Sequence, residues 1–330
     1  MKPRRTILLY YTVAAYSVES FSIAIFQQKR QYRESGVCFL NRFLLSAEEV
    51  SRDKDATLPY AILGKDDYRT IHAAKILNLR NGDSVRAGLV SSNDNNGFLT
   101  DHATVQWLPE GKIKKAEVLN NGEPPGSLHI TLQSLESSTQ RFSHSVSLIL
   151  ALPRPLQLGR MLPMISQMGV DHLVLTEARK VPKDYFGSHL FRKPELLTER
   201  LIEGLCQSGD TKLPKVTIVK SLSQFLDGKV DELFPLHSYA RVIAHPQRVV
   251  EDRVIESVRM RSVSFPTDSP RKIVIAVGPE GGWEEPNEID RFVNEHDFHQ
   301  ITMGTRVLRS DCAVVSLLGL AHDICDDYSE

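Results

Sequence analysis

The sequence predicts an α/β fold in which a C-terminal domain with a mostly parallel sheet follows a small β-rich domain. Two patterns predict this: strand-like and helix-like segments alternate after Val146, and short strands separated by polar turns precede it. A third observation locates the candidate site. Two loops that contain glycine each follow a strand near the C-terminus and lead into a helix. In open α/β sheets ligands bind beyond the carboxyl ends of strands, where such loops lie.

The N-terminal segment, residues 1–39, differs from the rest. The first forty residues have six basic and two acidic side chains, a net charge of +4. The apolar run at residues 7–15 is too short to span a membrane. A basic, serine-containing, acid-poor N-terminus is typical of transit peptides, so we expect an address to a plastid or a mitochondrion. The alternatives are a secretory signal, a disordered extension or a mis-assigned start, and a cytoplasmic location in place of an organelle.

The overall composition is ordinary for a soluble globular protein, with 41% hydrophobic and 25% charged residues. A chain of 330 residues is long enough for two domains with separate cores. Because the formal net charge is −1, a surface that binds nucleic acid would have to be local. The four cysteines are widely spaced without a CxxC pair, which predicts a reducing compartment and no metal site.

Residues 40–145 are expected to form a small barrel. Residues 68–79 have helical periodicity, with Ile71, Ala74 and Leu79 facing inward. Strand patterns lie at residues 84–89, 102–108 and 128–135. Polar turns lie at residues 81–83, 93–97 and 120–126. With 12 basic and 13 acidic side chains, the region does not indicate RNA binding by composition. The local cluster of Lys112, Lys114 and Lys115 is either an RNA contact or a solvated turn.

Residues 146–330 are expected to form the α/β domain, with helices on both faces of a parallel sheet. The predicted strands are residues 146–152, 172–176, 215–219, 240–244, 271–277 and 298–302. The predicted helices are residues 156–168, 194–207, 222–234, 249–263 and 313–324, with a further helix after Pro286.

The first glycine loop, residues 278–282, consists of Gly278, Pro279, Glu280, Gly281 and Gly282. It lacks the lysine and hydroxyl of a triphosphate loop and the spacing of a dinucleotide fingerprint. Its glutamate, and two more nearby, would repel a pyrophosphate. The loop therefore suits a neutral or cationic ligand with an adenine edge and a hydroxylated sugar, with the backbone coming close and Gly281 at positive φ. The alternative is a tight turn with no ligand.

The second glycine loop, residues 303–309, reads MGTRVLR and begins with Met303 and Gly304. VGPEGGW followed by MGTRVLRSDCAVVSLL resembles the C-terminal signature of the RsmE-type 16S rRNA (uridine-N3) methyltransferases of the SPOUT, or trefoil-knot, superfamily. Weaker likenesses lie at residues 168–170, 204–208 and 241–246. The chain departs from the family at four positions. Gln167 and Cys206 stand where an acid is usual, Asp311 where glutamate is usual, and Cys312 where threonine is usual.

The resemblance implies S-adenosyl-L-methionine as cofactor, small-subunit ribosomal RNA within an assembled subunit as substrate, and a homodimer. It also implies a PUA-like RNA-binding barrel over residues 40–145 and a knot within the SPOUT methyltransferase domain, residues 146–330. The cofactor-binding residues would be His245, Gly278, Pro279, Glu280, Gly281, Gly282, Met303, Gly304, Val307 and Leu308. His245 could equally cap its strand. Arg179, Lys180 and Lys183, in a long loop with His189, would bind RNA, although solvated lysines are the commoner case.

The chemistry of uridine N3 singles out Arg309 as the catalytic residue. The N3 proton must leave as the methyl group arrives, and a permanently charged guanidinium stabilises the resulting anion. Arg309 could instead form a bracing or dimer salt bridge, and Glu280 could bind the cofactor or brace its loop. No metal is expected, because sulfonium is already a strong leaving group. Ribose 2′-O methylation of tRNA and a non-catalytic RNA-binding or assembly role remain as alternatives.

Overall fold

A computed structural model describes residues 37–52, 58–90, 98–109, 123–133, 135–137, 144–246, 248–250, 253–255, 257–266 and 270–326. They divide into two compact units. The first contains the described residues up to Gly88 and from Leu99 to Glu136, and the second contains the remainder. The predicted extension lies outside the described residues except where the first strand begins at Val37, three residues before the expected boundary. The lysine cluster at residues 112–115 also lies outside them.

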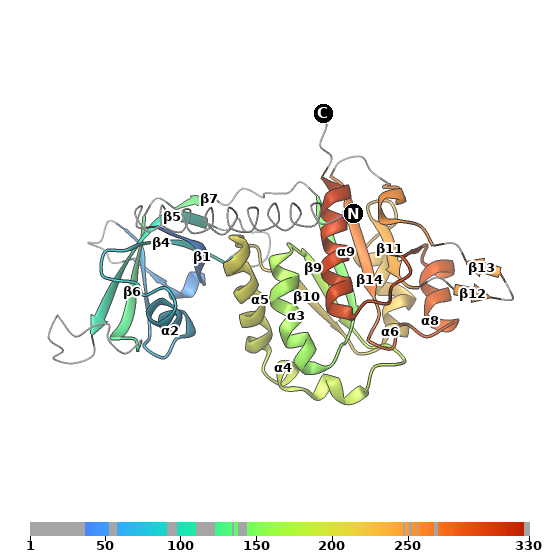
Figure 1. Cartoon of the computed structure of the whole chain (residues 1–330), viewed down its shortest axis with the longest axis horizontal. Helices are drawn as coiled ribbons and strands as arrows, with labels where there is room; N and C mark the ends of the chain where they lie inside the picture. The colour runs from blue at the N-terminus through green and yellow to red at the C-terminus, as the bar shows by residue number, and fades with distance from the viewer. Residues whose placement is uncertain are drawn as a thin grey trace, which may run out of the picture. The chain divides into compact units, whose positions relative to one another are not determined.

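The first unit contains one curled sheet with the strand order β1-β4-β5-β6-β3-β2, and β7 pairs with β5 (Figure 1). Its strands are β1 (Val37–Leu45), β2 (Val50–Ser51), β3 (Tyr60–Leu63), β4 (Ser84–Leu89), β5 (Phe98–Pro109), β6 (Gly126–Gln133) and β7 (Glu136–Ser137). Strict alternation of buried and half-buried residues along β6 turns one face of the sheet toward a core. The predicted barrel is therefore a half-barrel, with β1 and β2 at the two ends of the strand order.

Helix α2 (Tyr68–Lys75) begins where Asp67 accepts a hydrogen bond from the Arg69 N–H at 2.8 Å. It ends earlier than the periodicity predicts. Asn78 adopts φ 51° and leads the chain away from the helix axis. Leu79 is nevertheless buried, and its carbonyl accepts a hydrogen bond from the Trp107 indole at 2.9 Å, which fixes α2 to β5.

The second unit contains a six-stranded sheet with the order β10-β9-β8-β14-β11-β15, in which every neighbouring pair is parallel. The strands are β8 (Ser145–Ala151), β9 (His172–Thr176), β10 (Lys215–Val219), β11 (Ala240–Ala244), β14 (Lys272–Val277) and β15 (His299–Ile301). The runs β8 and β14 are buried almost throughout, as expected for central strands covered on both faces. The predicted α/β fold is confirmed.

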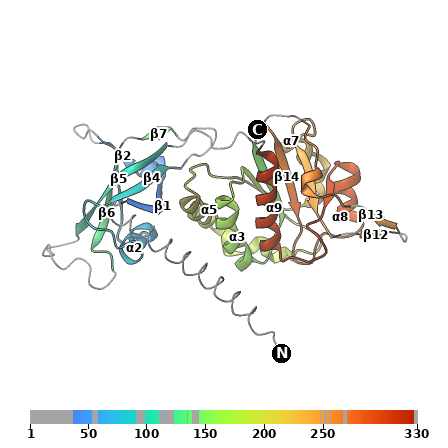
Figure 2. The same cartoon turned by 45° about the horizontal axis from the view of Figure 1, so that its top comes forward.

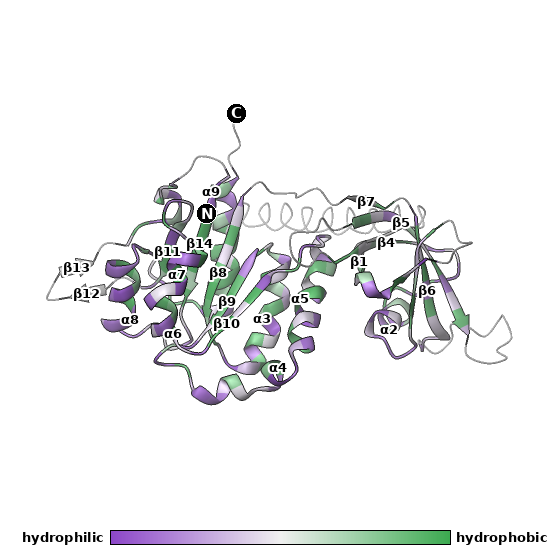
Figure 3. Ribbon diagram, turned by 180° about the vertical axis from the view of Figure 1, so that it is seen from behind, coloured by the Kyte–Doolittle hydropathy of each residue, from purple (hydrophilic) through white to green (hydrophobic). Residues whose placement is uncertain are grey.

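Helices cover both faces of this sheet. They are α3 (Pro155–Gln167), α4 (His189–Arg192), α5 (Pro194–Ser208), α6 (Leu222–Gln224), α7 (Val230–Leu233), α8 (Asn287–Asp290) and α9 (Ser310–Cys325). Helix α3 lies between α5 and α9 on one face (Figure 2). Helices α6 and α7 lie on the other face and contain hydrophilic residues (Figure 3). A π-helical turn, Phe225–Lys229, joins α6 to α7, and another, Arg291–Glu295, follows α8.

The predicted helix at residues 249–263 is wrong. The described residues there form two short antiparallel strands, β12 (Arg248–Val250) and β13 (Arg253–Ile255), and a 3₁₀ turn, Met260–Ser262. The apolar residues of the two strands are valine and isoleucine, whose β-branched side chains favour extended backbone. They fall into two groups on either side of a polar pair, which is the pattern of a hairpin rather than of an amphipathic helix.

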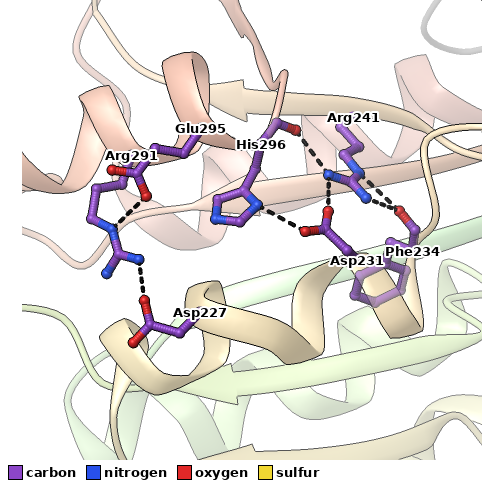
Figure 4. Close-up of polar contacts among 7 residues, drawn as sticks. All are labelled: Asp227, Asp231, Phe234, Arg241, Arg291, Glu295 and His296. Atoms are coloured by element: carbon purple, nitrogen blue, oxygen red, sulfur yellow. Dashed lines mark hydrogen bonds and ion pairs between the residues drawn. The ribbon is translucent and has the colours of Figure 1, made fainter.

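A buried arginine ties the loop after α7 to the loop after α8 (Figure 4). The Arg241 side chain is fully buried, and it donates to the Phe234 carbonyl at 2.6 and 2.8 Å and to the His296 carbonyl at 2.9 Å. The Asp231 carboxylate pairs with the Arg241 guanidinium at 2.7 Å and with the His296 ring at 3.2 Å. Since a buried guanidinium is costly unless all sides are paired, this network fixes the amino end of β11.

Candidate active site

The two glycine loops leave the sheet side by side. Strand β11 lies between β14 and β15, and its last residue, Ala244, is in register with both Val277 and Ile301. All three strands are parallel, so their carboxyl ends lie at one edge of the sheet. The first glycine loop follows Val277 and the second follows Ile301 after one residue. This edge is where ligands of open α/β sheets bind.

The first glycine loop is a tight turn in which the Gly282 N–H donates to the Pro279 carbonyl at 2.8 Å. Positive φ belongs to Gly282, at 68°, and the expectation of positive φ at Gly281 is wrong. Gly278 is required for a different reason. A Cβ there would lie 3.0 Å from the Trp283 backbone nitrogen and 3.2 Å from its ring, since Trp283 folds back over the turn.

Two charged side chains brace the first glycine loop. Lys180 donates from Nζ to the Gly281 carbonyl at 2.9 Å and to the Trp283 carbonyl at 3.1 Å. Glu280 accepts a hydrogen bond from the Arg154 N–H at 3.2 Å, at the residue that precedes α3. This contact is compatible with a bracing role for Glu280, and its contact with a cofactor stays a prediction. An RNA contact was predicted for Lys180. Its ammonium group hydrogen-bonds to carbonyls at this loop.

His245 directly follows β11, between the two loops. Its side chain is buried, its Nε2 lies 2.6 Å from a carboxylate oxygen of Glu285, and its N–H donates to the Ile301 carbonyl at 3.2 Å. The residue therefore both ends the strand and connects the segment after the first loop to the start of the second. Its contact with a cofactor stays a prediction.

The second glycine loop has an open backbone. Gly304 adopts φ 119°, and its N–H donates to the Thr302 hydroxyl at 3.2 Å. Within the described part of the chain, residues 305–308 form no hydrogen bond. Met303 is half-buried, whereas Leu308 is 40% and Val307 88% exposed. The loop thus presents unused backbone donors and acceptors beside apolar side chains, which is what a ligand with a flat polar ring requires.

Arg309 lies between the second glycine loop and α9 and is 73% exposed. Its Nη2 lies 3.3 Å from an Asp311 carboxylate oxygen and 3.3 Å from the Gln157 amide oxygen. Gln157 in turn donates to Asp311 at 2.6 Å. Desolvation raises the pKa of Asp311, but the Cys312 N–H, Gln157 and the Arg309 charge outweigh it and hold the pKa below its ordinary value. A permanent cation therefore stands at the site edge beside an ionised carboxylate.

The other residues predicted to bind RNA lie on the same side of the sheet, after β9. Arg179 is largely exposed, its N–H donates to Glu288 at 2.7 Å, and its guanidinium lies 3.8 Å from Glu284. Lys183 is exposed and begins a 3₁₀ turn, Lys183–Gly187, within what was expected to be an irregular loop. His189 is exposed at the start of α4. None of these placements tests the RNA contacts.

The described residues contain no group of three or more histidine, cysteine or carboxylate side chains that could hold a metal ion. In the same residues, no helix is long and apolar enough to cross a membrane. Cys312 and Cys325 are not part of a disulfide bond.

The site and the sheet together define a class of protein. A parallel sheet with aligned strand ends, two glycine loops on either side of β11 and an arginine beside the second loop fit the α/β methyltransferase domain that the resemblance implies. The chain belongs to the family described as RNA methyltransferase domain, whose model matches residues 140–322. The resemblance to the RsmE-type enzymes is thereby confirmed.

Relatives support this assignment over most of the chain. A protein of Treponema pallidum named ribosomal RNA small subunit methyltransferase E is 28% identical over 270 residues, which is 79% of this chain and 86% of that protein. The crystal structure of a protein of that name from Neisseria gonorrhoeae, bound to S-adenosyl methionine, is 18% identical with a TM-score of 0.58. It covers 86% of this chain and 98% of its own. A Legionella pneumophila methyltransferase, also with S-adenosyl methionine, is 17% identical at 87% and 98% coverage, with a TM-score of 0.58.

Sequence reasoning missed the residues that connect the site to α3. Gln157 contacts both Arg309 and Asp311, and the Arg154 N–H donates to Glu280, although neither residue was a candidate. Arg154 and Gln157 lie about 150 residues before the second glycine loop, at the start of α3. The hydrophobic periodicity of this helix indicates only which residues face the core. No local signal in the sequence predicts such contacts, because they depend on the pairing of β8 with β14.

Proposed function

We propose that this protein uses S-adenosyl-L-methionine to methylate N3 of a uridine in small-subunit ribosomal RNA. The observation that carries the proposal is the pair of glycine loops on either side of β11 with Arg309 at the end of the second. The family model supports an RNA substrate, and the names of the relatives support small-subunit ribosomal RNA. The position on the uridine rests on the resemblance of the two loops to the RsmE-type signature.

The residues at the loops fit an adenosyl cofactor. Within the described chain, residues 305–308 leave their backbone groups unused, so they can hydrogen-bond an adenine edge. Gly278 has no Cβ to clash with Trp283, which lets the turn pack tightly at the end of β14. Glu280, Glu284 and Glu285 surround this region with carboxylates, and these suit the positive charge of a sulfonium. When bound, the cofactor supplies an electrophilic methyl group.

The chain's own residues would act on the uridine. N3–H is a weak acid, and the negative charge that develops on the uracil ring needs a cation within hydrogen-bonding reach. Arg309 provides one that is always ionised, and Gln157 and Asp311 restrict its position. Proton removal is assigned to water or to a carboxylate of the loops, of which Glu280 and Asp311 are nearest in sequence to the two motifs.

The proposal includes partners and a place of action. Two copies of the chain are expected to form a homodimer, and the substrate is expected to be RNA within an assembled small subunit. For the place of action, we propose that residues 1–39 direct the protein to a plastid or mitochondrion. Fusion of these residues to a fluorescent protein tests the address directly, since a diffuse cytosolic signal would contradict it.

The test of the reaction is mass spectrometry of nucleosides from small-subunit ribosomal RNA after incubation with the purified protein and S-adenosyl-L-methionine. We expect 3-methyluridine, with assembled subunits the better substrate. A 2′-O-methylated nucleoside from tRNA would instead assign the other SPOUT chemistry. A melting temperature raised by S-adenosylhomocysteine, but with no methylated product from any RNA, would assign a binding or assembly role.

A further inference from the structure

An open depression of about 400 Å³ lies at the N-terminal end of α3. Its walls are Arg154, Pro155, Leu156, Gln157, Arg160 and Tyr185. The first five come from the start of α3, and Tyr185 comes from the 3₁₀ turn after β9. A volume of this size lies within the range of sites that hold a ligand as large as a nucleotide.

The depression is positively charged. Arg154 and Arg160 are exposed, and neither guanidinium has a hydrogen bond or ion pair within the described residues. No acidic side chain lines the walls. Arg241 and Arg291 in the same unit are, by contrast, paired with carboxylates. Two unpaired planar cations in one depression suit phosphate oxygens, which accept two parallel hydrogen bonds from a guanidinium.

The remaining surface of the depression is apolar and partly aromatic. Leu156 is 78% exposed at a position where a polar residue would be expected, and the Tyr185 ring is half-buried beside it. An aromatic ring next to arginines is the combination that binds single-stranded nucleic acid, because an unpaired base stacks on the ring while the cations hold the backbone. A base within a duplex could not stack in this way.

The depression adjoins both glycine loops. Gln157, one of its walls, contacts Arg309 and Asp311 at 3.3 and 2.6 Å. The Arg154 N–H is held by Glu280 at 3.2 Å. We propose that the depression binds a nucleotide of the substrate strand next to the methylated base, with Arg154 and Arg160 on phosphates and Tyr185 stacked on an unpaired base. This inference rests on the proposed function and adds that the target segment is single-stranded.

Binding of a short single-stranded oligouridylate, followed by fluorescence anisotropy at several salt concentrations, tests the depression without catalysis. For Arg154→Ala/Arg160→Ala we expect at least roughly tenfold weaker binding, with the salt dependence of log Kd reduced by roughly 1 to 1.5. Tyr185→Leu should weaken binding by about 5- to 100-fold and Tyr185→Phe should not, since it keeps the ring. The matched control is Lys220→Ala/Lys229→Ala, which removes two exposed charges elsewhere in the unit and should leave binding unchanged.

Kinetics with the natural substrate complete the test. The double arginine variant should raise KM for RNA, keep kcat at saturating RNA and keep its stabilisation by S-adenosylhomocysteine. Wild-type affinity and salt dependence in this variant would overturn the proposal. So would a change from dimer to monomer in sedimentation, because the depression would then hold a second copy of the chain. If the wild-type protein produces no 3-methyluridine, the proposed function fails, while the oligouridylate measurements still decide whether the depression binds RNA.

Discussion

At the scale of single residues, the three glycines of the first glycine loop differ in backbone conformation and in what a side chain at each position would meet. Gly278 is confined by the backbone of Trp283, Gly282 adopts positive φ, and Gly281 meets only Lys180. A Cβ at Gly281 would lie 3.2 Å from Lys180 Cδ, which belongs to a flexible side chain. The sequence cannot distinguish these cases, because all three positions are the same residue in one short motif. Their substitutions should therefore have different consequences.

Gly278→Ala should disrupt the cofactor site more than Gly281→Ala does. The added methyl group at position 278 must displace the turn itself, so we expect roughly 5- to 100-fold weaker binding of S-adenosylhomocysteine. At position 281 the lysine side chain can move aside, and the change should stay within about twofold. Isothermal titration calorimetry measures both. Equal losses would mean that the path of the backbone at Gly278 is not what the cofactor depends on.

Arg309→Ala should lower turnover and leave cofactor binding nearly intact. The guanidinium is largely exposed and its contacts are with Gln157 and Asp311, so its loss does not undo the loop. Loss of an electrostatic contact to a developing anion costs on the order of 10²-fold or more in kcat. Arg306→Ala is the matched control, since Arg306 is exposed in the same loop. If Arg309→Ala loses S-adenosylhomocysteine as well, the arginine braces the loop and has no catalytic role.

The protein should lose stability as the pH falls from about 6.5 to about 4, in part because of His172. Burial, together with the Lys215 charge, lowers the pKa of His172 to about 4, from an ordinary value of about 6.5. The unfolded chain therefore binds a proton in this interval that the folded chain does not, so stability is complete above the interval and decreases below it. The contribution of His172 to the free energy of unfolding is on the order of 1 to 3 kcal/mol, because its ring is only partly buried.

Urea unfolding at pH 7 and pH 5 measures the His172 contribution. His172→Gln keeps a group that can bond to the Thr217 hydroxyl, which lies 2.8 Å from Nε2, but it cannot titrate. The variant should lose less stability than the wild type between the two pH values. Some loss should remain, since burial, with the His144 charge, also lowers the pKa of His322. An identical loss in both proteins would contradict the assignment to His172.

At the scale of elements, the packing of α3 against α5 depends on one glycine. A Cβ at Gly204 would lie 2.0 Å from the Pro163 carbonyl and 2.1 Å from Ser166 Oγ. Ser166 also donates to the Leu201 carbonyl at 2.6 Å, so the two helices are joined at this point. Pro163 leaves no N–H for the turn before it, and the close approach of α5 covers this part of α3. Any side chain at position 204 must separate the helices.

Gly204→Ala should destabilise the second unit, and Gly159→Ala should not. The first change costs about 1–3 kcal/mol or more, which lowers the melting temperature by about 2–4 °C for each kcal/mol in a unit of this size. At Gly159 a Cβ would meet only Leu190 at an ordinary 3.8 Å, and alanine is favoured over glycine within a helix by about 1 kcal/mol. Thermal unfolding followed by circular dichroism measures both. A stable Gly204→Ala protein would show that α3 and α5 can move apart without cost.

Elements with a strong local signal were predicted, and those set by tertiary contacts were not. The apolar strands β8 and β14 and the helix α9 follow directly from their hydrophobic patterns. The hairpin of β12 and β13 was mistaken for a helix, since both arms are apolar and too short for a clear period. At the site, the glycine loops could be located from the sequence. The contacts of Lys180, Glu280 and Gln157 with residues more than 100 positions away could not.

At the scale of the whole molecule, charge is distributed locally. The formal net charge of −1 gives no general attraction to RNA, so binding has to come from small clusters of unpaired cations. Arg154 and Arg160 form such a cluster beside the candidate site. The predicted RNA-binding role of the first unit depends in part on Lys112, Lys114 and Lys115, which lie outside the described residues, and it stays a prediction.

The whole molecule is expected to be a homodimer, and α9 is the element that should form part of its interface. The inner side of this helix is buried in the core, yet Leu320 is 40% exposed on its outer side. Leu308 and Val307, in the second glycine loop just before the helix, are also exposed. Exposed apolar surface of this kind, next to a candidate site, is typical of a protein interface.

Leu320→Asp should therefore convert the dimer to a monomer, because it places a charge in a surface that is desolvated on association. Ile218→Asp is the control: Ile218 is 46% exposed on β10, at the opposite edge of the sheet order, and should leave the dimer intact. Sedimentation velocity at micromolar concentration measures the state of each protein. If association completes the site, the Leu320→Asp monomer should also lose methyl transfer. A wild-type chain that sediments as a monomer would contradict the dimer, and a monomeric variant with full activity would show that each chain carries a complete site.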